Sequence, residues 1–165
     1  MCTRKIWRCV VGVDGSDGGT LALSWATREA YARGGAVHAV IAWQWSDTEA
    51  RLLTGTTAEM VRHWSWQVLE DALMLARHEF PGVVLTGQTY QGDPADTLVS
   101  LGVEADLLVV GSHGHGRVGT PLGSVAGNCV HRATCPIVVV PTGKAFVLRV
   151  QSGGRLPGQL SLNSR

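Results

Sequence analysis

The sequence contains no long apolar run, although 45% of its 165 residues are hydrophobic. No segment approaches the roughly 20 consecutive apolar residues that a membrane-spanning helix requires. The first residues, MCTRKIWRCVVGVDGS, are charged and contain no apolar core of the length that a signal peptide needs. We therefore expect a cytoplasmic protein, with neither a membrane nor a nucleic acid among its partners.

Cysteine is scarce, and its four occurrences show no pairing motif. Cys2, Cys9, Cys129 and Cys135 never form a C-x-x-C, so a disulfide framework is not expected in an intracellular chain of this size. Cys129, His131 and Cys135 would supply three metal ligands, but their spacing matches no zinc template and no fourth ligand is apparent. We expect free thiols and no metal site.

Acidic side chains are absent after Asp106. The chain up to that residue holds 13 acidic and 8 basic residues, whereas the part beyond it holds 6 basic residues and no acidic one. A segment with this balance suits an anionic ligand. A basic tail that binds no ligand would show the same excess of basic residues. Charge alone therefore does not decide between an anion-binding segment and such a tail.

What the sequence does contain is a regular alternation of strand-like and helix-like segments in a chain long enough for one main domain. Short apolar runs predict strands at about 7–14, 36–45, 83–92, 106–111 and 136–141, and helical periodicity predicts helices at about 17–33, 57–79, 93–104 and 120–132. Strands buried on both faces and joined by helices form a mostly parallel sheet. We therefore expect an open α/β domain of three layers, with a five-stranded sheet and helices on both faces.

Apolar residues recur at helical spacing in the first two predicted helices. They are Leu21, Ala22, Trp25, Ala26 and Ala30 in the first, and Met60, Trp64, Val68, Ala72 and Leu75 in the second. We expect both faces to be buried. The tryptophans are accordingly interpreted as anchors of the core or of an interface, rather than as a surface on which a nucleotide stacks; they are Trp25, Trp43, Trp45, Trp64 and Trp66.

A glycine-rich segment, VVGSHGHGRVGTPLGSVAGNC at 109–129, follows the fourth predicted strand. Glycines let backbone N–H groups approach an anion, and the first turn of the next helix adds unpaired donors, so the pattern predicts phosphate binding. Thr120 and Pro121 predict the start of that helix. The segment 114–119 also matches the dinucleotide-binding pattern G-x-G-x-x-G. No acidic residue follows that could bind a ribose, which argues against a dinucleotide-binding fold. The Walker A motif G-x-x-x-x-G-K-[ST] does not occur in the sequence.

Three segments resemble the universal stress protein family over about residues 5–141. They are VVGVDGSDGGTLALSWA, ADLLVVGSHGHGR and LGSVAGNCVHRATCPIVVVP. The resemblance implies a Rossmann-like sheet of the adenine nucleotide alpha hydrolase-like type and a homodimer formed through the last strand. It also implies ATP binding through G-x-x-G, nine residues and G-[ST], with Mg²⁺ as companion of the triphosphate. Residues 142–165 form a C-terminal extension, rich in Gly, Ser and Pro, that we interpret as a mobile tail.

The resemblance assigns the binding residues by matching this motif. Gly111 and Gly114 fall on its first half, Gly123 and Ser124 on its second, and Asp14 matches the acidic residue near the adenosine. The neighbouring positions are Gly12, Ala42, Val110, His113 and Val125. Between Gly114 and Gly123 this chain has eight residues instead of nine. The shorter loop either tightens the cradle or moves Gly123 out of register, and we expect binding to be retained.

Several of these residues have a simpler interpretation. In this interpretation Asp14 only caps the first helix and does not contact a ligand. Ser124 is then an ordinary hydroxyl at the start of a helix. Arg117 either reaches the phosphates or stays in solvent. Ser112 and His113 form no nucleophile elbow, because no helix begins directly after the serine, and we assign no catalytic residue.

The function that we predict is ATP-dependent regulation in the stress response, exerted on an unidentified protein partner. Two alternatives remain open. One is a family member that does not bind ATP and acts through dimer or partner contacts. The other is a slow ATPase or an autophosphorylating protein, with Ser124 as the acceptor.

Overall fold

The computed structural model describes residues 6–46, 55–114 and 122–142. Its elements follow one another in alternation: β1 (Arg8–Gly12), α1 (Asp17–Arg33), β2 (Ala36–Trp43), α3 (Ala58–Glu79), β3 (Val84–Gln91), α4 (Pro94–Gly102), β4 (Leu107–Gly111), α5 (Ser124–Arg132) and β5 (Ile137–Val140). Each predicted strand and helix is present, and the bounds differ from the predicted ones by a few residues at most.

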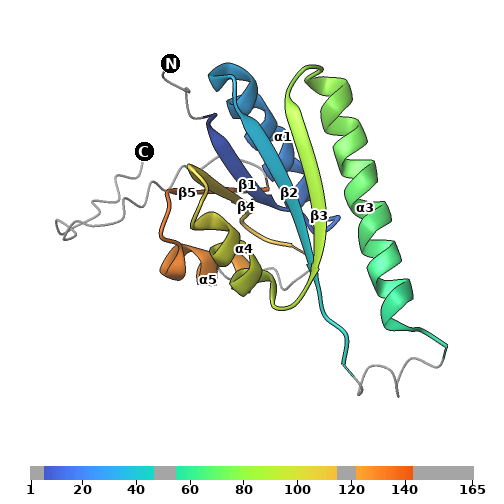
Figure 1. Ribbon diagram of the computed structural model, residues 1–165. Coiled ribbons are helices and arrows are strands. Elements are labelled where there is room, and N and C mark those ends of the chain that lie inside the picture. Colours follow the sequence, from blue (N-terminus) through green and yellow to red (C-terminus); the bar gives the residue numbers. More distant parts are fainter. Residues whose placement is uncertain (1–5, 47–54, 115–121, 143–165) are drawn as a thin grey trace.

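The sheet has the strand order β3-β2-β1-β4-β5, and every neighbouring pair is parallel (Figure 1). In the register of the sheet, Val10 of β1 lies between His38 of β2 and Leu108 of β4. Helices α1 and α3 pack on one face, and α4 and α5 pack on the other. The three-layer α/β architecture predicted from the sequence is confirmed.

Two separate cores hold these layers together. Alternate strand residues contribute to each: Val11 joins the core under α1 and α3, whereas Val10 joins the core under α4 and α5. Leu23 and Leu73 fill the first core, and Leu98 and Leu108 fill the second. Strand β4 is covered on both sides and is apolar throughout, with the sequence LLVVG.

Helix α1 begins and ends where the sequence predicts. The Ser16 side chain accepts a hydrogen bond from the Gly19 N–H at 3.1 Å and caps its start. Gly34 ends it in the left-handed conformation, with φ of 63°. The predicted apolar face is confirmed at its alanines, which are buried, but it is wrong at Leu21, which is exposed while Leu23 lies in the core.

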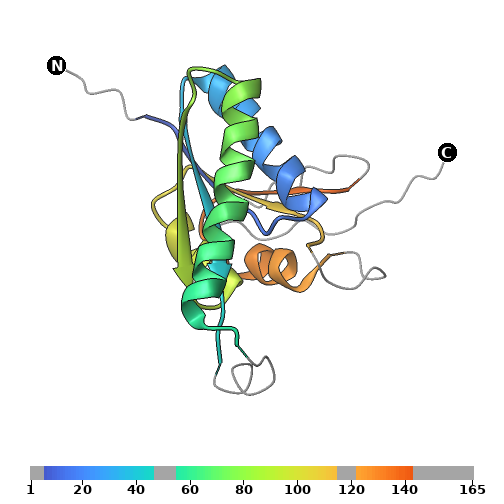
Figure 2. The same ribbon diagram turned by 90° about the vertical axis from the view of Figure 1, so that its right-hand side faces the viewer.

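The predicted buried face of α3 is wrong except at Ala72, which is partly buried against the first core. Met60, Trp64, Val68 and Leu75 are exposed, and the side chains that α3 buries are Leu69, Leu73 and Ala76. Helix α3 carries two apolar stripes, and only the one that begins at Leu69 meets β2 and β3. Figure 2 shows α3 lying along the outside of the sheet. The sequence predicts Trp64 and Trp66 as anchors of the core or of an interface; because both are exposed, the core is excluded, and a place in an interface stays a prediction.

The cysteines within the described ranges are free thiols in the interior. Cys9, Cys129 and Cys135 are buried and unpaired with one another, and Cys2 lies outside the described residues. Burial raises the pKa of the Cys9 thiol and raises that of Cys129 to about 11. Among the residues that the structure places, no group of three His, Cys, Asp or Glu side chains is arranged to hold a metal ion.

We expect Cys9 and Cys129 to resist alkylation in the native protein. At pH 8 a thiol whose pKa is about 11 is ~0.1% thiolate, and the thiolate is the reactive form. Mass spectrometry after iodoacetamide treatment should find both unmodified, and should find both alkylated once guanidinium chloride is present. Rapid labelling of Cys129 without denaturant would contradict the buried position.

No helix among the described residues is long and apolar enough to cross a membrane.

Candidate functional site

A pocket of about 230 Å³ opens at the carboxyl ends of β1, β2 and β4. The strand order places β1 beside β4, so the chain winds outward from this point in both directions. Ligands of open α/β sheets bind at such switch points. The pocket is lined by Gly12, Val13, Asp14, Gly19, Val40, Ala42, Pro94, Leu98, Val110, Gly111, Ser112, His113, Gly114, Gly123, Ser124, Val125 and Ala126.

One wall of the pocket is apolar. Val40 and Ala42 are two residues apart on β2, so both point to the same face of the sheet, and Val110 of β4 lies on that face as well. Pro94 and Leu98 contribute from the first turns of α4. A flat aromatic group fits a wall of this kind.

Asp14 supplies the acidic side of the pocket. Its Oδ1 accepts two hydrogen bonds from Ser16, one from the backbone N–H at 3.0 Å and one from the hydroxyl at 2.5 Å. The cap of α1 is therefore Ser16, and the interpretation of Asp14 as that cap is wrong. The carboxylate lies against Gly114, because a Cβ built on that glycine would overlap Asp14 Oδ2. Asp14 thus stands at the pocket, oriented by Ser16 and next to the glycine loop.

The two halves of the glycine motif meet directly. The Gly123 N–H donates to the Ser112 carbonyl at 2.7 Å, and the Ser112 N–H donates to Val140 of β5 at 2.7 Å. Gly123 is thereby fixed to the end of β4, although residues 115–122 separate it from Gly114 in the sequence. The His113 ring lies 3.2 Å from the Ser112 hydroxyl. The eight-residue spacer therefore still allows both halves of the motif to line the same pocket.

The start of α5 supplies backbone donors at this pocket. The helix begins at Ser124, with Gly123 in the cap position and no side-chain cap. Its first turn carries no acidic residue, so the positive end of the helix dipole is not neutralised there. The prediction that Thr120 and Pro121 start the helix is wrong, because the bond to Ser112 holds Gly123 in extended conformation; those two residues lie outside the described ranges.

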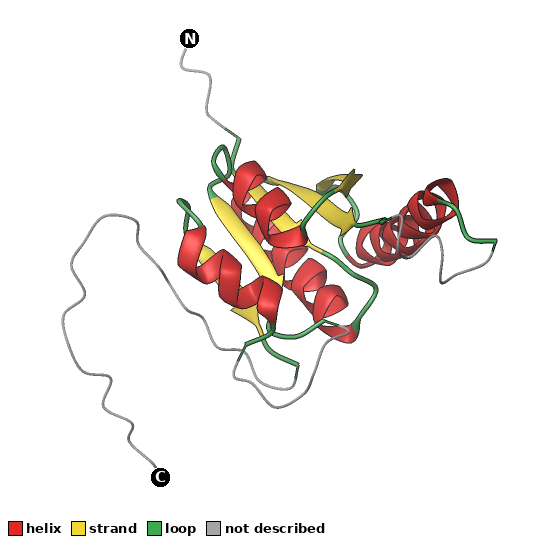
Figure 3. Ribbon diagram, turned by 90° about the horizontal axis from the view of Figure 1, so that it is seen from below, coloured by secondary structure: helices red, strands yellow, loops and turns green. Residues whose placement is uncertain are grey.

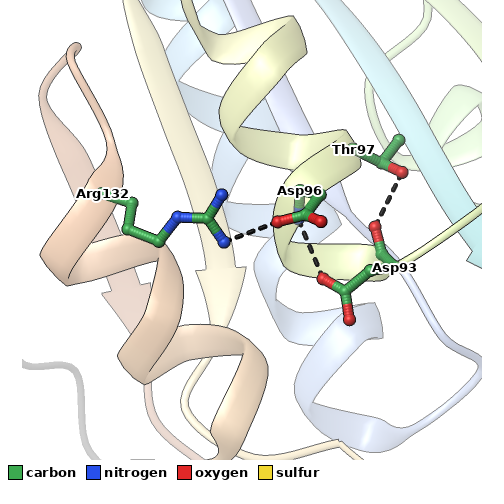
Figure 4. Close-up of polar contacts among 4 residues, drawn as sticks. All are labelled: Asp93, Asp96, Thr97 and Arg132. Atoms are coloured by element: carbon green, nitrogen blue, oxygen red, sulfur yellow. Dashed lines mark hydrogen bonds and ion pairs between the residues drawn. The ribbon is translucent and has the colours of Figure 1, made fainter.

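An ion pair joins the two helices that flank the pocket. Figure 4 shows Arg132 of α5 donating to Asp96 of α4, at 2.5 Å. Asp93 caps α4 by accepting from the Asp96 N–H at 3.0 Å, and its carbonyl accepts from the Thr97 hydroxyl at 2.8 Å. Both partners of the ion pair are about half exposed, so it contributes less than about 1 kcal/mol. It adds to the apolar contacts by which α4 and α5 pack in the second core.

The pocket brings together all ten residues that the sequence proposed for binding, from Gly12 and Asp14 to Ser124 and Val125. That they bind a nucleotide stays a prediction. Arg117, also considered, lies outside the described residues. Sequence analysis missed Val13, Gly19, Val40, Pro94, Leu98, Ser112 and Ala126. Two of these could have been found from the sequence. Pro94 is at the start of the helix that follows β3, and Val40 is two residues before Ala42 on the same strand, so both side chains point to the same face.

Fold and pocket together define an open, parallel α/β domain with a ligand pocket at its switch point and a glycine cradle between β4 and α5. The model of the Universal stress protein family matches residues 6–141. The chain belongs to the universal stress protein family.

Relatives and solved structures agree with this assignment. Universal stress protein Rv2005c of Mycobacterium tuberculosis is 37% identical over 131 residues, which cover 79% of this chain and 44% of that protein. The chain thus spans less than half the length of the curated relatives it matches. A universal stress protein solved in complex with cAMP is 28% identical, with a TM-score of 0.60 over 81% of this chain and 94% of the other. For the fold alone, the protein from Archaeoglobus fulgidus solved with dAMP has a TM-score of 0.63 at 24% identity, covering 82% and 98% of the two chains.

Proposed function

We propose that the pocket binds an adenine nucleotide, ATP accompanied by Mg²⁺, and that its occupancy regulates contacts with a partner protein in the stress response. The observation that carries the proposal is the hydrogen bond from Gly123 to Ser112, which places both halves of the glycine motif around one pocket. The solved relative that binds cAMP supports a nucleotide as the class of ligand.

Each part of the pocket has a role in this proposal. The apolar wall of Val40, Ala42 and Val110 accommodates the base, and the oriented Asp14 carboxylate accepts hydrogen bonds from ribose hydroxyls. The backbone N–H groups at the start of α5 bind phosphate oxygens. The described residues contain no cluster of metal-ligating side chains, so the phosphates themselves carry the Mg²⁺.

We further propose a cytoplasmic homodimer joined through β5. This strand is at the edge of the sheet and pairs with β4 on one side. Its four residues, Ile137 to Val140, are buried by the layers above and below. An apolar edge strand is a ready site for pairing with another strand.

The test of nucleotide binding is calorimetric titration of the full chain with magnesium ATP. We expect a dissociation constant on the order of micromolar, and weaker binding of cAMP and AMP if the cradle holds the outer phosphates. The Gly123→Val variant should lose binding, because its Cβ would lie 3.2 Å from the Ser112 carbonyl oxygen and its methyl groups would enter the pocket. Absence of binding by folded wild-type protein refutes the proposal and favours a function in partner contacts alone.

A further inference from the structure

A second cavity, of about 250 Å³, lies at the end of the sheet opposite the proposed nucleotide pocket. Arg8, Ala36 and Val84 line this cavity, and they are the first residues of β1, β2 and β3. The proposed nucleotide pocket opens at the carboxyl ends of the strands instead. A ligand in the second cavity, here called the His38 cavity, therefore does not compete with a nucleotide for space.

Three side chains from neighbouring strands form the floor of the His38 cavity. Val10 pairs in register with His38, and His38 pairs with Thr86. Side chains at paired positions point to the same face of a sheet, and Val10 belongs to the core under α4 and α5. Val10 is buried, His38 is half-buried and Thr86 is exposed, so the cover that α4 provides ends above His38. Figure 3 shows α3 at one side of the molecule, and this helix packs on the opposite face of β2 and β3.

Apolar side chains form the walls of the His38 cavity. Leu101, in the last turn of α4, and Ala105, just after this helix, pack against the second core and line the cavity. Val84 lines it at the start of β3 and is 61% exposed. Arg8 and Glu104 line the rim; both are exposed, and their charges are opposite. An apolar cavity of about 150 Å³ accommodates benzene, so the His38 cavity has room for one aromatic ring with a small substituent.

The hydrogen bonds of His38 determine which of its ring nitrogens carries the proton. Its Nδ1 lies 2.9 Å from the Thr86 hydroxyl oxygen, and that hydroxyl donates to the Val37 carbonyl at 3.4 Å. Because a hydroxyl has one hydrogen and a carbonyl oxygen only accepts, His38 Nδ1 is the donor to Thr86. In the neutral ring Nε2 is then the acceptor. Burial lowers the pKa of His38, which favours this neutral form at pH 7.

The acceptor of the His38 ring is available inside the cavity. Among the described residues, Thr86 is the hydrogen-bond partner of the ring, through Nδ1, and Nε2 has none. Within the same part of the chain, no fully buried side-chain nitrogen or oxygen lacks a partner. The Nε2 atom is therefore accessible, and the space beside His38 is the cavity that it lines.

We propose that the His38 cavity binds a small, uncharged aromatic molecule whose one O–H or N–H group donates a hydrogen bond to His38 Nε2. The ring lies against the apolar walls and the single acceptor fixes its orientation, which is the usual division of roles in a small-molecule site. Arg8 and Glu104 together bring no net charge, so an ionic ligand would lose its hydration without gaining a counter-charge. The proposal does not depend on nucleotide binding at the other end of the sheet.

The first test compares phenol with anisole in titrations of the full chain, followed by ¹H–¹⁵N NMR spectra. The two probes share the ring, but anisole has a methyl group in place of the hydroxyl hydrogen and cannot donate. We expect phenol to saturate with a dissociation constant on the order of millimolar, with the largest shifts at the amides of His38, Leu101 and Ala105. Anisole should bind about fivefold more weakly, because it lacks one hydrogen bond. Equal affinities, or no saturable shifts at these amides, would overturn the proposal.

The second test uses His38→Phe, which keeps an aromatic ring on the floor of the cavity and removes Nε2. This variant should bind phenol and anisole with equal affinity, and a preference for phenol that persists in it refutes the proposal. His63→Phe is the matched control, because His63 is exposed on α3, and it should keep the preference for phenol. The ring ¹⁵N signals of the wild-type protein give an independent measure: a proton on His38 Nδ1 supports the proposal, and a proton on Nε2 contradicts it. Titrations with magnesium ATP report on the other pocket, so the two proposals fail independently.

Discussion

Replacing Gly114 with alanine is expected to weaken nucleotide binding at least tenfold while the protein stays folded. The added methyl group would occupy the place of Asp14 Oδ2. That atom is the end of a side chain, so it moves aside at little cost to the fold, and the carboxylate turns away from the orientation in which Ser16 holds its Oδ1. A tenfold loss corresponds to about 1.4 kcal/mol of binding free energy. Binding rather than folding is weakened, because the displaced carboxylate is the proposed partner of the ribose.

The measurement is a pair of experiments on the same variant: calorimetric titration with magnesium ATP and thermal unfolding. Gly127→Ala is the matched control, since it adds the same methyl group in α5 with nothing within 4 Å of the new Cβ. It should bind as the wild-type protein does. Unchanged affinity in Gly114→Ala would show that Asp14 has no part in recognition.

The same change three residues earlier, Gly111→Ala, is expected to destabilise the fold itself, by about 3 kcal/mol. A Cβ on Gly111 would lie 2.7 Å from both the carbonyl carbon and the oxygen of Gly18, in the first turn of α1. Backbone atoms do not rotate aside as a carboxylate does. The start of α1 has to move away from the end of β4, which disturbs the packing of the first core.

Urea unfolding followed by circular dichroism measures this effect, and the midpoint should fall with no change in slope. Gly127→Ala again provides the reference. A free-energy loss below about 0.5 kcal/mol, the usual range for surface substitutions, would mean that α1 and β4 are not held in close contact. Gly114→Ala is thus expected to weaken nucleotide binding, and Gly111→Ala, three residues earlier, is expected to lower the free energy of unfolding.

The sequence predicts the strands and helices well because each is marked by a local pattern, whereas their order in the sheet, β3-β2-β1-β4-β5, was not predicted. Each apolar run is followed by turn residues and a helical segment. The ten binding residues were assigned by the resemblance to the family, and all of them line one pocket. The burial of α3 was not predictable in the same way. Periodicity defines the angle between Leu75 and Leu73, but not which of their two stripes meets the sheet.

The start of α5 illustrates the same limit. Thr120 and Pro121 form a local start signal as good as Gly123. The choice depends on a hydrogen bond to Ser112, a residue from the preceding strand end, which no local pattern reveals. Where a tertiary contact decides between two local signals, the sequence alone leaves the helix boundary open.

The hydrogen bond between Gly123 and Ser112 also means that the position of Gly123 depends little on the number of residues between Gly114 and Gly123. With both ends fixed to each other, going from eight residues to nine changes the entropy of closure by about 0.1 kcal/mol. We therefore expect that insertions and deletions between Gly114 and Gly123 leave the backbone N–H groups at the start of α5 in place. In this chain the bond, and not the number of spacer residues, places both halves of the motif at one pocket.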